Sequence, residues 1–172
     1  SDRFAPRVAF DLFTVYSSMG SNAIADAARA RLVFDYPQSF QAGFLYTTFE
    51  DAEDFRNFLN ERTEQQFEKN PAELPEKFCQ VFKIGLMRFK GSSELAGDFS
   101  LLLKAYAFSQ ITQDTELASM ARRELSLKRI EVEQGPALET MDACMDGNLA
   151  PLDRVLRLNA VKDNTDARFI KK

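Results

Sequence analysis

Two carboxylate pairs in this sequence have the residue types and spacing for metal-dependent chemistry. Glu61 and Glu64 lie three residues apart, and Glu139 and Asp142 repeat that spacing. Residues three apart share one face of a helix, so each pair could offer two oxygen ligands to one ion. Mg²⁺ prefers oxygen ligands and does not require imidazole. The four residues are therefore candidate ligands of a magnesium-dependent enzyme.

The E-x-x-E and E-x-x-D spacing resembles the motifs of the all-α NTP pyrophosphohydrolases. The resemblance implies Mg²⁺ held against the phosphates of a nucleotide by Glu61, Glu64, Glu139 and Asp142. In that family the two motifs lie on helices close in sequence, whereas here the pairs are about 75 residues apart. The alternative interpretation is that both pairs lie on solvated helix faces.

Other common catalytic chemistries lack their residues. The chain has no histidine, which excludes Ser–His and Cys–His nucleophile pairs and His-ligated metals within this chain. Its seven glycines form neither G-x-G-x-x-G nor a P-loop. Cys79 and Cys144 are far apart, and we interpret them as two buried, reduced thiols. We therefore expect no cofactor and assign no catalytic residue.

Basic residues gather at one place in the sequence and suggest a second alternative, nucleic-acid binding. One predicted helix carries Arg122, Arg123, Lys128 and Arg129. Glutamates interrupt this run at positions that allow i,i+3 and i,i+4 ion pairs, which is typical of an exposed, salt-bridged helix. The net charge of -4 also argues against a general nucleic-acid binder. We do not expect nucleic acid to be the partner.

The sixteen phenylalanines provide the third indication of function. Most recur at helical spacing and are expected in the core. Four lie near predicted helix ends or in loops: Phe4, Phe40, Phe49 and Phe169. If a single bundle leaves them uncovered, they would form an apolar patch of the kind found at protein interfaces. The alternative is that the loops and the tail fold over the core.

The hydrophobic residues recur at helical spacing between breaks at Gly, Asn and Pro. In the first predicted helix, one apolar face carries Val8, Leu12, Val15 and Tyr16. The segment from Thr47 to Glu50 has the pattern of a capping box. The predicted helices cover 6–18, 21–35, 47–67, 71–91, a segment from 92 or 93 through 108, 115–133, 136–145, and a last one from 151. Residues 38–46 are expected to form either a short helix or an ordered loop.

This pattern predicts an all-α, single-domain bundle of about seven or eight helices over residues 1–172, with 163–172 a flexible polar tail. The hydrophobic fraction of 45% and charged fraction of 28% are typical of a globular protein. No stretch approaches the roughly 20 apolar residues that a membrane span needs. We expect a cytoplasmic protein.

The function that we predict is a non-catalytic protein-protein interaction module: an adaptor, a regulator or a subunit of an assembly. It would act through the exposed phenylalanines and the charged helix faces. Residues 48–77 carry nine acids against four bases, and residues 149–172 carry six bases against three acids. Such opposite poles allow self-association as well as binding to another protein.

Overall fold

The computed structural model of the chain describes residues 4–91 and 93–131. These residues form eight helices, with no strand among them. The helices are α1 (Ala5–Ser18), α2 (Asn22–Asp35), α3 (Phe40–Tyr46), α4 (Ala52–Lys69), α5 (Leu74–Arg88), α6 (Ser93–Ala96), α7 (Phe99–Thr112) and α8 (Thr115–Glu131). The all-α prediction is confirmed. The helices predicted for 136–145 and from 151, and the tail at 163–172, lie outside the described residues.

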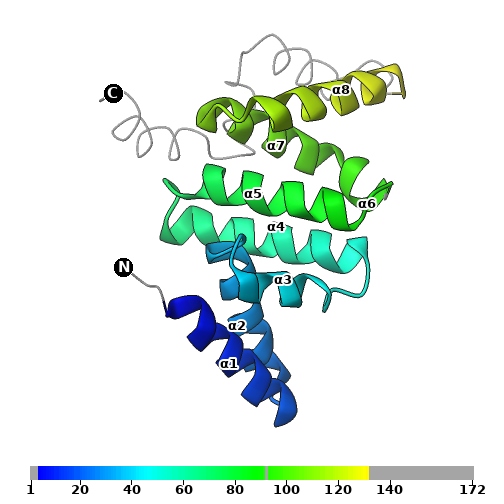
Figure 1. The fold of residues 1–172 in the computed structure, drawn as a ribbon. Helices are drawn as coiled ribbons and strands as arrows, with labels where there is room; N and C mark the ends of the chain where they lie inside the picture. The colour runs from blue at the N-terminus through cyan, green and yellow to red at the C-terminus, as the bar shows by residue number, and fades with distance from the viewer. Residues whose placement is uncertain (1–3, 92, 132–172) are drawn as a thin grey trace.

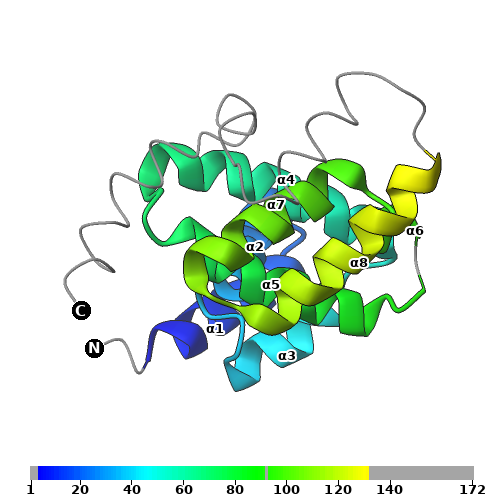
Figure 2. The same cartoon turned by 90° about the horizontal axis from the view of Figure 1, so that it is seen from above.

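The helices are stacked approximately in chain order, with α1 and α8 at opposite ends (Figure 1). α1 packs mainly on α2, and α8 packs mainly on α7. In the middle of the stack α4 contacts α5, and α5 contacts α7. A view down the stack shows α7 and α8 overlying α5 (Figure 2). The arrangement is thus a series of neighbouring helices, with α1 and α2 forming a hairpin at one end.

The first helix begins and ends close to the predicted positions. Pro6 lies in its first turn, where a missing N–H costs nothing. Gly20 follows the helix with φ +73°, a left-handed conformation that glycine adopts without a steric penalty. The chain then reverses within three residues, so α2 runs back along α1.

The predicted capping box at Thr47–Glu50 is wrong. Thr47 is the C-cap of α3, and its hydroxyl donates to the Phe44 carbonyl oxygen at 2.6 Å. The cap of α4 is Asp51, whose carboxylate accepts from the Asp54 N–H at 2.8 Å. The Asp54 carboxylate in turn accepts from the Glu50 N–H at 3.2 Å. A related reciprocal arrangement is thus made four residues later, in which the second donor is the N–H of the residue before the cap, because the threonine is engaged by the end of the preceding helix.

The single helix predicted from Ser92 or Ser93 through Phe108 is divided in two. α6 ends at Ala96, and Asp98 then caps α7 by accepting from the Leu101 N–H at 2.9 Å. Gly97 and Asp98 therefore act as a break that the apolar spacing alone did not indicate. α7 is buried along its middle, from Leu101 to Ser109, as its nearly uniform apolar sequence predicted.

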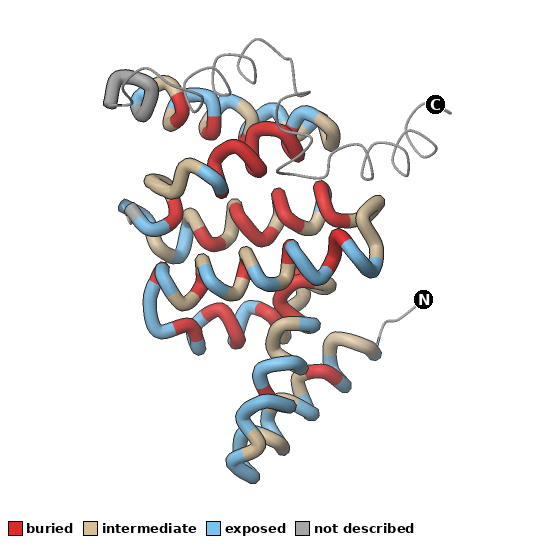
Figure 3. The backbone as a smooth tube through the Cα atoms, turned by 180° about the vertical axis from the view of Figure 1, so that it is seen from behind, coloured by how far each residue is buried: buried red, intermediate tan, exposed pale blue. Residues whose placement is uncertain are grey.

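Buried residues gather in the middle of the stack (Figure 3). Leucine and phenylalanine provide most of the large side chains of this core. The Phe55 ring of α4 lies 5.2 Å from that of Phe49 and 5.6 Å from that of Phe89, centroid to centroid. The Phe78 ring of α5 is 5.2 Å from that of Phe108 on α7. Edge-to-face and tilted pairs at these distances add attraction beyond burial itself. These contacts join α4, α5 and α7 into one packed body.

Candidate functional site

A stripe of exposed apolar side chains runs along one side of α1. Its five members, from N-cap to C-cap, are Phe4, Val8, Leu12, Val15 and Met19, and they are 42–73% exposed. Ile24, half exposed on α2, lies beside the stripe and lines a shallow groove with Phe4, Val8 and Leu12. We refer to these six residues as the hairpin face.

The hairpin face is exposed because α1 is apolar on more sides than its neighbours can cover. With 3.6 residues per turn, the stripe occupies roughly a quarter of the helix circumference. Ala9, Phe10 and Phe13 extend round the adjacent side, where they pack against α2 and the core. Arg7 and Asp11 lie on the remaining, polar side. In Figure 3 exposed residues predominate along this end of the stack.

An aromatic pair flanks α1 on the side away from the stripe. Phe40 and Phe44 on α3 are 79% and 52% exposed, and their rings meet edge to face at 5.0 Å. Phe44 also lies 5.9 Å from the ring of Phe10 on α1. Phe10 of α1 therefore contacts the pair on one side, and the rest of the pair is exposed to solvent.

The predicted phenylalanine set is only partly uncovered. Phe4 and Phe40 are exposed, as expected. The expectation for Phe49 is wrong, because its side chain is only 1% exposed. It turns from the α3–α4 loop into the core, and the Arg29 guanidinium lies over its ring at 4.6 Å. Phe169 lies outside the described residues.

The basic helix is only partly described. Arg122 and Arg123 are exposed on α8, and Arg123 makes an ion pair with Glu124 at 3.7 Å. The side chains of Lys128 and Arg129 lie outside the part that the structure describes. One base of the run is therefore paired with an acidic neighbour. Nucleic-acid binding stays an untested alternative.

Whether the two carboxylate pairs converge is not tested, because Glu139 and Asp142 lie outside the described residues. Glu61 and Glu64 are exposed on α4. Within residues 4–91 and 93–131, no three Cys, Asp or Glu side chains converge closely enough to hold a metal ion. Glu64 lies near enough to the buried Lys104 of α7 to affect its pKa.

No family model, curated protein or solved structure matches this chain. In the part of the chain that the structure describes, no helix is long and apolar enough to cross a membrane.

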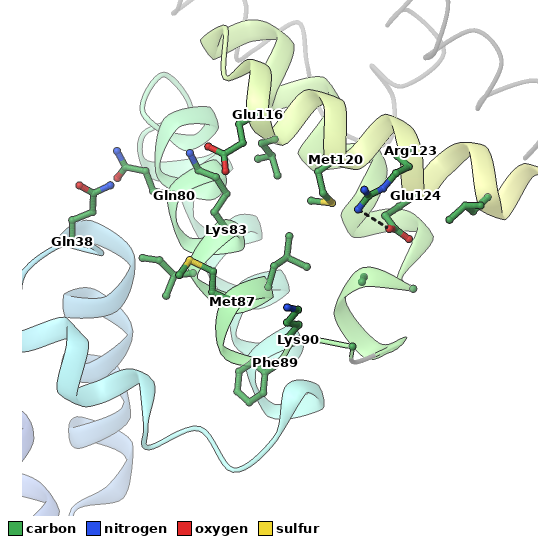
Figure 4. Close-up of a pocket in the computed structure, with 17 residues that line it drawn as sticks. Gln38, Gln80, Lys83, Met87, Phe89, Lys90, Glu116, Met120, Arg123 and Glu124 are labelled. Carbon is green, nitrogen blue, oxygen red and sulfur yellow. Dashed lines mark ion pairs between the residues drawn. The ribbon is translucent and has the colours of Figure 1, made fainter.

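A groove of about 1120 Å³ lies between α5 and α8 (Figure 4). Met120, Arg123 and Glu124 enter it from α8, opposite Met87 of α5 and Lys90 just beyond it. Met87 is 81% exposed. Methionine-rich surfaces adapt to differently shaped partners, so this groove is a second candidate surface.

Several buried groups have altered acidity, and Cys79 and Lys104 are two of them. Burial raises the pKa of the Cys79 thiol to about 12, so the thiol is protonated at neutral pH and is a poor nucleophile. Burial lowers the pKa of Lys104 on α7, and the nearby charges of Glu64 and Asp98 oppose that shift. Cys79 is confirmed as a buried free thiol. We assign neither group a chemical role.

Sequence reasoning missed that the stripe of α1 faces solvent. It recognised the shared face of Val8, Leu12 and Val15 but not its direction. The available signal was that Phe10 and Phe13 give the same helix a second apolar side. A helix at the end of a stack has few neighbours, so one of the two sides had to remain open.

Proposed function

We propose that the chain is a non-catalytic protein-interaction module that binds a protein partner through the hairpin face. Adaptors, regulators and assembly subunits all act in this way. The observation that carries the proposal is the exposure of five apolar side chains on one side of α1. Contiguous apolar patches of this kind mark interaction sites on proteins in water.

The energetics favour an occupied face. Fully burying an aliphatic or aromatic side chain contributes about 1.5–3 kcal/mol, and side chains that are half exposed have gained only part of it. Six such residues side by side could therefore supply a substantial part of a binding free energy. The aromatic pair of Phe40 and Phe44 extends the apolar surface on the other side of α1.

Site-specific photo-crosslinking in the source cells tests this proposal. A photoreactive residue in place of Val8 or Phe4 should give a defined crosslinked protein. The matched control is the same residue in place of Thr14, which is exposed on the polar side of α1. The crosslink should disappear when Val15→Glu is added. Equal crosslinking from Val8 and Thr14, or none from either, would contradict the proposal.

A further inference from the structure

We propose that the partner of the hairpin face is a second copy of this chain, so that two α1–α2 hairpins associate as a four-helix arrangement. This inference rests on the proposed function and names the partner.

The hairpin face has a raised side and a low side. The raised side is the α1 stripe, where Val8, Leu12 and Val15 project into solvent. The low side is on α2, where Ala27 and Ala28 line the groove next to α1. That groove measures about 480 Å³ and is open along its length to Val8 and Leu12. A ridge, which is the α1 stripe, and a trough, which is the groove beside α2, thus run parallel on one surface.

A two-fold axis between α1 and α2, parallel to both, makes this surface complementary to itself. Rotation about such an axis places the ridge of each copy over the trough of the other. Because α1 and α2 are antiparallel, α1 would also be antiparallel to the α2 that it meets in the second copy. This is the isologous geometry of most homodimers and the helix arrangement of antiparallel bundles.

The area is adequate for a dimer of modest strength. Six side chains of this size, each about half exposed, present on the order of 600 Å². Stable interfaces use about 800 Å² per partner, and weaker ones use less. The backbone and alanine surface of α2 adds to the contact. The hairpin face is therefore large enough to hold a second copy, and we expect a dissociation constant near the micromolar range, roughly that of a small interface.

Charge is neutral or slightly adverse in this arrangement. Asp11 lies at the outer margin of the α1 stripe, and Arg31 lines the groove between α1 and α2. The two-fold leaves the position along the helices unchanged, so it brings the two Arg31 residues to the same level on either side of the centre. Shape and area, rather than charge, therefore favour a second copy.

Measurement of mass in solution tests the inference directly. At about 100 µM, far above a micromolar dissociation constant, the full chain should sediment as a dimer. Val8→Glu with Val15→Glu should weaken association at least about 100-fold, because carboxylates would be buried without partners. Both positions are exposed in the single chain, so folding should be unaffected; circular dichroism checks this. The control Thr14→Glu should remain a dimer.

Cysteine pairing tests the two-fold arrangement. In a Cys144→Ser background, a mixture of Val8→Cys and Ala27→Cys chains should form an intermolecular disulfide, whereas either variant alone should not. A dimer that survives Val8→Glu with Val15→Glu, or that crosslinks equally well from Val8→Cys alone, would overturn the inference. A wild-type chain that is monomeric at about 100 µM would also overturn it. In that case a photo-crosslink from Val8 to a different protein would leave the proposed function standing.

Discussion

Gly85 on α5 lies directly against the Phe55 ring of α4. A Cβ atom at Gly85 would overlap the Phe55 ring, and both residues are buried. Glycine is therefore needed here for space rather than for backbone freedom. Gly43, on α3, contrasts with it, because a Cβ at that position would meet nothing within 4 Å.

Gly85→Ala should destabilise the protein by about 1–3 kcal/mol, since α4 and α5 would have to separate. Gly43→Ala should be neutral or stabilise by up to about 1 kcal/mol, because alanine favours an open helical position. Urea unfolding of both variants measures the difference. Equal effects of the two substitutions would show that the helices do not approach as described.

Asp114 performs two tasks at the start of α8. Its carboxylate accepts from the Leu117 N–H at 3.1 Å as a cap, and it makes an ion pair with Lys83 of α5 at 2.7 Å. Partial burial acts to raise the pKa of Asp114, but the hydrogen bonds from Lys83 and from the Leu117 N–H outweigh it and lower the pKa. The hydrogen bond to Asp114 raises the pKa of Lys83.

The pair should therefore stabilise the fold between about pH 4 and pH 10. A lowered carboxylate pKa stabilises above the unfolded value, and this contribution is lost as the pH falls through the folded-state pKa. For the raised pKa of Lys83, the contribution is lost as the pH rises through the folded-state pKa. Asp114→Asn, which can still cap, should cost less than about 1 kcal/mol at pH 7.

Asp114→Ala should cost about 1 kcal/mol more than Asp114→Asn, because it also removes the cap. The loss of stability between pH 5 and pH 3, followed by urea midpoints, should be smaller in Asp114→Asn than in the wild type. Parallel pH curves for the two would argue against an electrostatic role of the pair.

At the scale of elements, the positions of the helices along the chain were predictable, but the neighbours on which each helix packs were not. The apolar spacing and the glycine and proline breaks located α1, α2, α5 and α8 within a few residues. Local competition between neighbouring groups, as at Thr47 and Asp51, shifted one helix start. The outward direction of the α1 stripe depends on which helices are nearby, and periodicity contains no information on that. The burial of Phe49 has the same cause.

Replacement of Thr47 or Asp51 by alanine tests which of the two residues caps α4. Asp51→Ala should destabilise by about 1 kcal/mol, because the first turn of α4 loses its acceptor. Thr47→Ala should have a smaller effect, since it removes only a hydroxyl contact to the last turn of α3. Thermal unfolding of both variants under one buffer condition is sufficient. A larger loss from Thr47→Ala would restore the capping box that the sequence suggested.

At the scale of the whole molecule, stability should be unequal along the stack. Among the residues that the structure describes, α7 is buried from Leu101 to Ser109, whereas Ala9 is the one buried residue of α1. Local opening is easiest where few buried contacts must be broken. Helix α1, which carries most of the proposed binding face, is thus the least buried of the long helices that the structure describes.

Amide hydrogen exchange should reveal this gradient. In dilute protein, below the dissociation constant of any dimer, residues 101–109 of α7 should exchange most slowly and α1 should exchange much faster. Raising the protein concentration should slow exchange in α1 and α2 selectively, since association covers them. Uniform protection from α1 to α7 would contradict the unequal support of the two helices.

The stacking of the helices in chain order has a consequence for how the protein folds. Most of the described helices pack on one that is close to them in sequence, so few long loops have to close before these native contacts form. Chains with such local contacts fold quickly. During synthesis, each helix that leaves the ribosome finds its packing partner already present or about to appear. Folding can therefore follow translation, one hairpin after another.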